Sequence, residues 1–312
     1  TGLRTKHLTA MLADDRCSDK VACALTAFVN SVAFGDCDPE LARLLCAGRV
    51  VPIIKKKDAT KKIAIRPLVV GECLQNLVAI CWLGRVLGKL ESDLQPRHLG
   101  LGRHTGVENA VHTAKLLATT MTPSQVLIKV DFTNAYNTLN RSPIVESILG
   151  RCPELAGWAS WTLKTAVQLA AGESSVWCTT GVQQGDPISP LFFSLATAEV
   201  ATALDTTFNT PANPRRLVQQ WYLDDGLFLV EKCDMLPVLD VLEKDSLSIG
   251  LQLNRSKCEV LGSGDDLPAS AANARCVAFP NRLKWTYLGC PLAEADNNHP
   301  TFKDALERVE LL

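Results

Sequence analysis

The sequence predicts an α+β fold with a split βαβ arrangement and antiparallel strand pairing. From Val126 onward the chain shows a buried-type strand, then helices, a close pair of strands, a helix and another strand. Hydrophobic residues make up 47% of the chain and charged residues 21%, which is typical of a globular protein. A chain of 312 residues is long enough to bury roughly 75% of its unfolded surface. These observations exclude wholesale disorder.

The N-terminal half predicts helices around one short strand pair. Apolar residues between Val21 and Val32 recur at helical spacing, and Gly35 follows as a stop. Two short apolar runs, 50–54 and 63–70, predict strands on either side of a lysine-rich loop. Residues 74–90 predict a second apolar-periodic helix.

The C-terminal half predicts the elements that carry the acidic residues. Thr105 to Glu108 has a capping-box pattern that opens a helix to about Leu117. Ser142 and Pro143 resemble an N-cap and first helical residue. The remaining expected elements are strands at 126–130, 217–223, 227–230 and 258–261, helices at 154–171, 189–204 and 236–249, and a linker at 262–274.

Charge and cysteine content narrow the function classes. The net charge of −1 gives no overall attraction to nucleic acid, so such binding must come from local patches. The 12 cysteines are scattered without a C-x-x-C pair, which favours free reduced thiols and an intracellular compartment. The longest charge-free stretch, 21–35, is shorter than the ~18 residues of a membrane helix, so no membrane association is expected.

Three acidic residues lie where strands end. Asp131 follows an apolar strand, and Asp224 and Asp225 stand between two apolar strands. If these strands are neighbours in one sheet, the carboxylates converge, and their mutual repulsion makes sense only with cations between them. Hard divalent ions such as Mg²⁺ take oxygen ligands, and two such ions support phosphoryl or nucleotidyl transfer. The alternative is a solvated turn, since Asp-Gly is a common hairpin dipeptide.

Six segments in order resemble the motifs of reverse transcriptases, most closely those of the non-LTR retrotransposon type. The resemblance covers about residues 51–291. Its motifs are the basic run 55–62 with Ile65 to Leu68, Val130 to Tyr136, Gly181 to Leu191, Tyr222 to Asp225, Gly250 to Cys258, and Tyr287 to Gly289. The resemblance implies a right-hand polymerase with fingers and palm.

The resemblance also implies a role for each matching residue. Asp131, Asp224 and Asp225, with the backbone carbonyl of Phe132, would hold two Mg²⁺ ions, for which Mn²⁺ substitutes. Lys257 would protonate the pyrophosphate leaving group as a general acid. The residues implied to bind the nucleotide are Lys55, Lys57, Arg66, Phe132, Tyr136, Gln184 and Gly185. The implied partners are an RNA template, a DNA primer and dNTPs.

Each of these residues also has a purely structural interpretation. Tyr136 is equally an ordinary core tyrosine, Lys257 a solvated lysine, and the basic run a solvated face. Arg66 suits bidentate phosphate binding because its guanidinium is a planar fork. The loop after residue 96 offers further template-contacting candidates, namely Arg97, His98, Arg103 and His104.

The predicted organisation has four parts. These are a helical N-terminal extension (1–50), a fingers-like region (51–125), a palm-like core (126–262, with a fingers-side segment near 150–185), and a tail (263–312). The tail would hold a linker, a primer-grip-like hairpin and the start of a thumb. Only 22 residues follow Cys290, so we expect the thumb to be largely missing and to be supplied by a longer protein or a partner.

Three functions fit the sequence. The leading one is an RNA-directed DNA polymerase of a retrotransposon, which acts in cytoplasm and nucleus if the resemblance holds. An RNA-directed RNA polymerase has the same palm, but such enzymes carry Gly-Asp-Asp at the hairpin, where this chain has Leu223. The third is a catalytically inactive RNA-binding remnant, against which the three intact aspartates argue.

Overall fold

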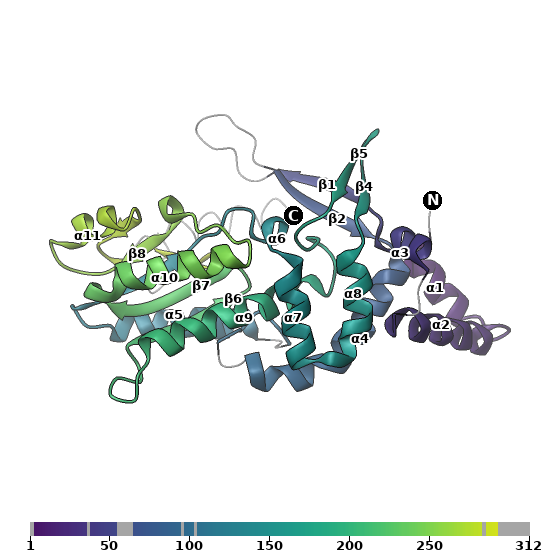
Figure 1. Cartoon of the computed structure of the whole chain (residues 1–312), viewed down its shortest axis with the longest axis horizontal. Helices are drawn as coiled ribbons and strands as arrows, with labels where there is room; N and C mark the ends of the chain where they lie inside the picture. Colours follow the sequence, from purple (N-terminus) through teal and green to yellow (C-terminus); the bar gives the residue numbers. More distant parts are fainter. Residues whose placement is uncertain are drawn as a thin grey trace, which may run out of the picture. The chain divides into compact units, whose positions relative to one another are not determined.

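The computed structural model describes residues 3–35, 38–54, 65–94, 97–102, 105–282 and 285–292 (Figure 1). Its packing divides the chain into two compact units, each made of two separate stretches. Unit 1 comprises Thr1–Leu90 and Tyr136–Ala196, and unit 2 comprises Glu91–Ala135 and Thr197–Leu312. The four-part division expected from the sequence stays a prediction.

Unit 1 combines the N-terminal helices with a small sheet. Helix α2 (Ser18–Ala33) ends just before Gly35, whose φ of +84° suits a residue without a Cβ atom. The other elements lying wholly in this unit are α1 (Thr5–Leu12), α3 (Pro39–Cys46), β1 (Gly48–Ile54), β2 (Ile65–Gly71), α7 (Arg141–Arg151), η1 (Pro153–Leu155), α8 (Ala156–Lys164), β4 (Val167–Ala171) and β5 (Ser174–Cys178). Helices α4 (Cys73–Leu94), α6 (Ala135–Thr138) and α9 (Ser189–Phe208) have residues in both units.

The sheet of unit 1 has the order β2-β1-β4-β5 (Figure 1). Strands β1 and β2 form the expected antiparallel pair, while β1 runs parallel to β4. Val69, Val167 and Leu169 pack with Cys46 into a small buried cluster. This cluster fixes the sheet against the end of α3.

Unit 2 is built on a five-stranded sheet with the order β6-β7-β3-β8-β9. The central strand β3 (Gln125–Val130) is antiparallel to both neighbours, β7 (Asp225–Glu231) and β8 (Glu259–Leu261), which confirms the split arrangement. Leu127 and Ile128 of β3 are fully buried, so this strand forms the core of the unit. The remaining elements are α5 (Gly106–Thr120), β6 (Leu217–Tyr222), η2 (Lys232–Asp234), α10 (Met235–Ser248), η3 (Arg255–Lys257), α11 (Leu267–Asn273), β9 (Val277–Phe279), β10 (Thr286–Tyr287) and β11 (Cys290–Pro291).

Helix α4 is long and apolar enough to cross a membrane by length and composition alone, a test that core helices of soluble proteins also pass. Its buried side chains in unit 1 lie at helical spacing along one stripe, at Gln75, Val78, Ala79, Trp82, Val86 and Leu90. One such helix is weak evidence for a membrane span, and the buried stripe shows that one face of α4 packs within unit 1.

Three sequence predictions about local structure are wrong. The helix expected over 154–171 ends at Lys164, and the chain turns back as the β4–β5 hairpin around Gly172, at a φ of +65°. The expected linker 262–274 contains α11. Helix α7 has Asn140 rather than Ser142 as its N-cap, so Pro143 lies in its first turn, where no N–H is required.

Two further details differ from the sequence predictions. Thr105 precedes α5 but makes no capping bond; its hydroxyl instead accepts a hydrogen bond from the Asn109 side chain at 3.3 Å. The β6–β7 hairpin turns at Leu223 and Asp224 instead of at Asp224 to Gly226, because Asp225 and Gly226 already belong to β7.

The cysteines follow the sequence prediction of free thiols. No cysteine within the described ranges forms a disulfide, and Cys46, Cys152 and Cys258 are buried. Buried free cysteine acts as a small apolar side chain. These thiols therefore contribute to packing.

Candidate active site

In unit 2, strand register brings the three predicted aspartates to one end of the sheet. Val130, the last residue of β3, pairs with Gly226, so Asp131 continues the strand beside the start of β7. Tyr222 pairs with Asp225 across the hairpin, which leaves Asp224 in the turn itself. The backbones of all three residues thus converge.

The turn between β6 and β7 has only two residues and a strained backbone. Leu223 has a φ of +56°, a region that β-hairpins normally fill with glycine or asparagine. Such conformations persist only where surrounding structure enforces them, and they concentrate at functional sites. This backbone conformation of Leu223 sets the orientation of the next residue, Asp224, in the turn.

A segment after α4 braces this hairpin from outside. The Leu99 N–H donates to the Trp221 carbonyl at 2.8 Å, and the Trp221 N–H donates to the Arg97 carbonyl at 2.7 Å. Gly100 lies so close to the hairpin that an added Cβ would come within 2.9 Å of the Leu223 side chain. This segment therefore supports the strained turn.

The same bracing corrects the expected template contacts. His98 is 2% exposed and stacks on Trp221, and Arg97 forms an ion pair with Asp205 at 2.5 Å. The His98 ring is therefore withdrawn from solvent, whereas the Arg97 side chain is partly exposed and engaged by Asp205. Arg103 and His104 lie outside the described residues.

Tyr287 provides a second brace for the aspartates. Its ring is fully buried, and its hydroxyl donates to the backbone carbonyl of Asp225 at 3.2 Å. Burial raises the pKa of the Tyr287 phenol, and the nearby Asp225 carboxylate adds to this rise. The hydroxyl thus stays protonated and keeps its donor role.

Phe132 directs its backbone carbonyl toward the aspartates. Phe132 lies opposite Leu253 in an antiparallel bridge, and the hydrogen bonds of this bridge are made by the neighbouring residues. The Thr133 N–H donates to the Gln252 carbonyl at 2.9 Å, and the Asn254 N–H donates to the Asp131 carbonyl at 2.8 Å. In such a non-hydrogen-bonded pair the carbonyl of Phe132 points away from Leu253. Strand β8 lies on the Leu253 side of β3 and β7 on the other, so the carbonyl faces the β7 side.

The donor chemistry of this strand end fits a hard divalent cation. The three aspartates and Phe132 offer carboxylate and carbonyl oxygens, which are the ligands that Mg²⁺ prefers. Across the described parts of the chain, no three His, Cys, Asp or Glu side chains already form a metal-binding group. Like charges without a cation repel one another, so we expect the three carboxylates to close together only around metal.

Lys257 lies near this strand end but remains solvated. It closes the short η3 turn, where its N–H donates to the Asn254 carbonyl at 2.9 Å, and its side chain is exposed. Asn254 in turn bonds to Asp131, so the turn is tied to the aspartate's backbone. The role of Lys257 as a general acid stays a prediction.

In unit 1, the structure joins the nucleotide-binding candidates through β2. Arg66 is exposed near the start of this strand. The Val69 N–H donates to the Gln184 carbonyl at 2.6 Å, and Gly185 approaches so closely that a Cβ would lie 2.4 Å from the Val69 carbonyl. Gly185 also has a φ of +112°, so only glycine fits. Lys55 and Lys57 lie outside the described residues.

Tyr136 belongs to the same group through its backbone. Its carbonyl accepts a hydrogen bond from Val182 N–H at 2.8 Å, which anchors the start of the 181–191 motif. Its half-buried ring stacks on Phe193 with centroids 4.9 Å apart. One ring face is therefore covered by protein, as both the core and the sugar-binding interpretations allow.

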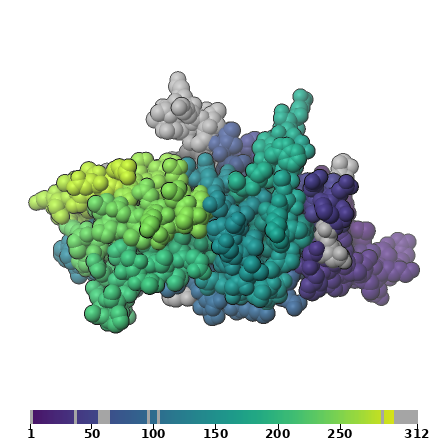
Figure 2. All heavy atoms as spheres, in the orientation of Figure 1, coloured from purple at the N-terminus to yellow at the C-terminus, as the bar shows by residue number. Residues whose placement is uncertain are grey.

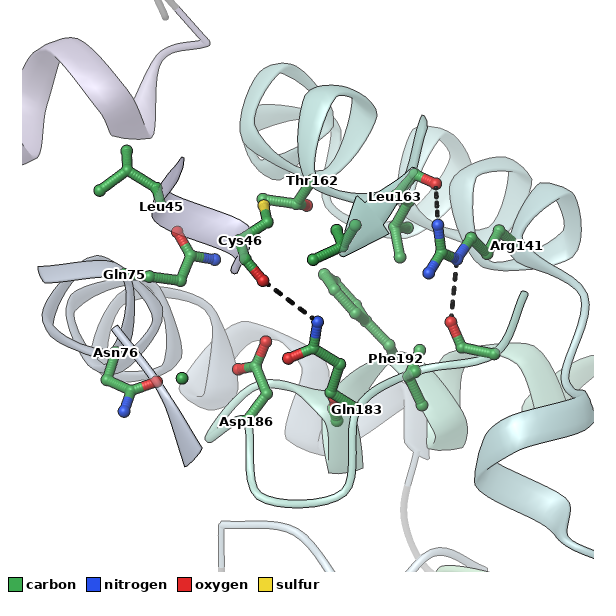
Figure 3. Close-up of a pocket in the computed structure, with 15 residues that line it drawn as sticks. Leu45, Cys46, Gln75, Asn76, Arg141, Thr162, Leu163, Gln183, Asp186 and Phe192 are labelled. Carbon is green, nitrogen blue, oxygen red and sulfur yellow. Dashed lines mark hydrogen bonds between the residues drawn. The ribbon is translucent and has the colours of Figure 1, made fainter. Parts of the chain in front are cut away.

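Arg141 is a positioning residue that the sequence did not reveal. Its guanidinium donates to the carbonyls of Gly181 and Leu163 at 2.9 Å (Figure 3). It also donates to the Thr165 carbonyl at 3.2 Å. It thereby ties the end of α8 to the first residue of the 181–191 motif. A lone arginine in a helix's first turn carries no sequence signal for this role.

A small pocket of about 40 Å³ is lined in part by this motif (Figure 3). Asp186 and Gln183 point into it, and Gln183 Nε2 donates to the Cys46 carbonyl at 3.3 Å. Burial raises the pKa of Asp186 to about 6, although a hydrogen bond from the Ile188 N–H opposes this rise. The ionised form of Asp186 is thus destabilised in this pocket.

Replacing Asp186 with asparagine is expected to stabilise the protein at neutral pH. The Asp186 carboxyl has a pKa of 3.8 in the unfolded chain and about 6 in the folded protein. As pH rises from about 4 to 6, the unfolded chain loses this proton first, so the free energy of unfolding falls. Asp186→Asn removes this loss and keeps the acceptor for Ile188, so the unfolding free energy should rise by roughly 1–3 kcal/mol at pH 7.5. The gain should shrink toward pH 4. Denaturant titrations at both pH values, with exposed Asp15→Asn as control, measure it; a gain equal at both would contradict burial as the cause.

The central sheet of unit 2, with aspartates at its strand ends, defines the palm of a template-directed polymerase. Residues 54–292 match the family model of reverse transcriptase (RNA-dependent DNA polymerase), and the chain belongs to this family. It is 26% identical over 265 residues to the retrotransposable element SLACS 132 kDa protein of Trypanosoma brucei gambiense, covering 83% of this chain and 21% of that protein.

Solved structures share the fold at low sequence identity. Telomerase from Candida albicans, in complex with a TWJ fragment of telomeric RNA, aligns with a TM-score of 0.52 and 11% identity over 76% of this chain and 45% of that one. Apo telomerase from Candida tropicalis aligns with a TM-score of 0.50 and 14% identity over 70% and 44%. These likenesses establish the fold alone.

Proposed function

We propose that the chain is the polymerase core of a retrotransposon reverse transcriptase, which adds dNTPs to a primer 3′-hydroxyl by copying an RNA template. The observation that carries this proposal is the convergence of Asp131, Asp224 and Asp225 at one strand end in a member of the reverse transcriptase family. The relatives are longer than this chain, so the activity of the whole protein is part of the proposal.

The residues divide the chemistry between them. Asp131, Asp224, Asp225 and the Phe132 carbonyl would hold two Mg²⁺ ions. When bound, these ions supply activation of the primer hydroxyl and stabilisation of charge on the phosphates. Tyr287 and the 97–100 segment hold the backbone of the hairpin, so only the carboxylate side chains would move when metal binds.

Nucleotide selection falls to the residues of unit 1. Arg66 would bind the triphosphate, Gln184 and Gly185 would contact the nascent base pair, and Tyr136 would contact the sugar. Lys257 of unit 2 would give a proton to the departing pyrophosphate.

Primer extension tests the proposal directly. The purified chain is incubated with a primed RNA template, Mg²⁺, and either dNTPs or rNTPs. Extension with dNTPs is the expected result. Extension with rNTPs alone would indicate an RNA polymerase, and RNA binding without any extension would indicate an inactive remnant.

Arg66 makes a separate prediction about the nucleotide. Arg66→Ala should raise the KM for dNTPs about tenfold or more, and Arg66→Lys should restore it only in part because the fork geometry is lost. Steady-state kinetics at two salt concentrations measure both effects. Arg49→Ala is the matched control, since the register Arg49–Val70 places Arg49 on the same face of the sheet at the other end of the strand pair. An unchanged KM in all three variants would mean that Arg66 belongs to a solvated face.

A further inference from the structure

A groove of about 890 Å³ lies on unit 1, and none of the residues assigned to nucleotide or metal lines it. One wall comes from the junction between α2 and α3, including Phe34 and Arg43. The opposite wall comes from the end of α8 with Lys164, and from Trp177 of β5. In Figure 2 the hairpin that carries Trp177 projects from the surface near α3.

The two walls are fixed to each other by close backbone packing. A Cβ added to Gly157 would lie only 2.8 Å from the Phe34 carbonyl, so the two segments touch without side chains between them. Trp161 Nε1 donates to the Val32 carbonyl at 3.2 Å and closes the floor. The groove is therefore a built feature of the fold.

Two large aromatic rings are left exposed at this groove. Phe34 is 63% exposed, and its position is fixed by an edge-on contact with the buried ring of Trp82. Trp177 is 60% exposed on an edge strand. Exposed aromatic faces are the surfaces on which unpaired nucleic-acid bases stack.

Two cations complete the groove. Arg43 and Lys164 are exposed, and within the described part of the chain neither forms an ion pair and no acidic residue lines this groove. The chain as a whole has a net charge of −1, so this positive patch is a local feature. Its charge complements a phosphate backbone.

We propose that this groove binds a single-stranded segment of RNA, with bases stacked on Trp177 and Phe34 and phosphates bound by Arg43 and Lys164. The choice of RNA as ligand rests on the proposed function, because an enzyme that copies RNA must hold unpaired template. The purely structural alternative is that both cations, which lie in the last turns of α3 and α8, only stabilise the helix dipoles.

Fluorescence anisotropy on the full chain tests the proposal. The probe is a labelled single-stranded uridine homopolymer of about 12 nucleotides, within the site sizes of such grooves. Trp177→Ala should weaken binding about fivefold or more. The double variant Arg43→Gln with Lys164→Gln should lower the slope of log Kd against log salt by about 1.4, at ~0.7 per lost phosphate contact. Val176→Ala, the neighbouring residue in β5, and the exposed Lys20→Gln are matched controls that should bind like wild type.

The outcomes separate this proposal from its alternatives. Unchanged affinity and salt slope in the groove variants would overturn it, and so would a lower melting temperature as their sole effect. Equal weakening in the control variants would also overturn it, by showing a loss that is not specific to the groove. Primer extension on a template of a few nucleotides should be the same in wild type and groove variants. If wild type extends no primer yet the groove variants lose RNA affinity, the polymerase proposal fails and the groove proposal stands.

Discussion

Asp224→Asn is expected to reduce primer extension by about a thousandfold or more while leaving the free energy of unfolding unchanged or higher in metal-free buffer. The substitution removes a charged oxygen ligand, and the loss of several kcal/mol of transition-state stabilisation corresponds to such a factor. Asparagine suits the turn position as well as aspartate does, so the hairpin should keep its shape. Removing one of three converging negative charges should also relieve repulsion in the absence of metal.

The measurement pairs single-turnover primer extension with denaturant titration in a chelator. Asp265→Asn, an exposed position in the same unit, is the matched control and should retain wild-type activity. A second readout is the stabilisation conferred by Mg²⁺, which should be smaller in Asp224→Asn than in wild type. Near wild-type extension by Asp224→Asn would eliminate the two-metal assignment.

Strong periodic signals in the sequence predicted most of the fold. The pairing of β3 with β7 and β8 followed from continuous apolar runs that end at Asp131 and at the 224–226 segment. Helices α2 and α10 ended, as expected, just before Gly35 and Gly250, both at positive φ. These elements depend on local patterns, which is why the sequence alone was sufficient.

The β4–β5 hairpin was missed because its signal competes with a helical one. Residues 154–171 contain tryptophans and alanines at helical spacing, yet Val167 and Leu169 alternate with exposed residues as a strand does. Gly172, at the first position of a two-residue turn, was the signal for a hairpin. Pairing with β1, far away in the sequence, decides the outcome, and no local pattern reports it.

The candidate site shows the same limit. The aspartates were predictable because the chemistry demands those residue types at strand ends. Arg141 was not, and although Tyr287 stood in a recognised motif its bond to Asp225 was not foreseen, since each side chain bonds to a backbone carbonyl distant in sequence. Leu223 was also unpredictable, because a branched side chain at a φ of +56° violates the usual turn preference.

Tyr136→Val is expected to raise ribonucleotide incorporation about tenfold or more relative to dNTP incorporation. Tyr136 lies five residues beyond Asp131 in the chain, where the family places an aromatic ring under the sugar. If the ring occupies the space of a 2′-hydroxyl, it excludes rNTPs by steric repulsion, and a smaller side chain removes that repulsion. Use of dNTPs should fall only modestly, because Asp131, Asp224 and Arg66 are unchanged.

The contact with Phe193 gives the core interpretation a distinct outcome. If Tyr136 only packs on that ring, which is fully buried, Tyr136→Val leaves a cavity, lowers the unfolding free energy, and depresses dNTP and rNTP use equally. Tyr136→Phe keeps the ring and its stacking, so under the steric interpretation its selectivity should match that of wild type. The deciding quantity is the ratio of kcat/KM for a dNTP to that for its matching rNTP, measured in wild type, Tyr136→Phe and Tyr136→Val. A ratio that stays constant across all three proteins assigns Tyr136 to the core, whereas a ratio that falls in Tyr136→Val alone assigns its ring to sugar selection.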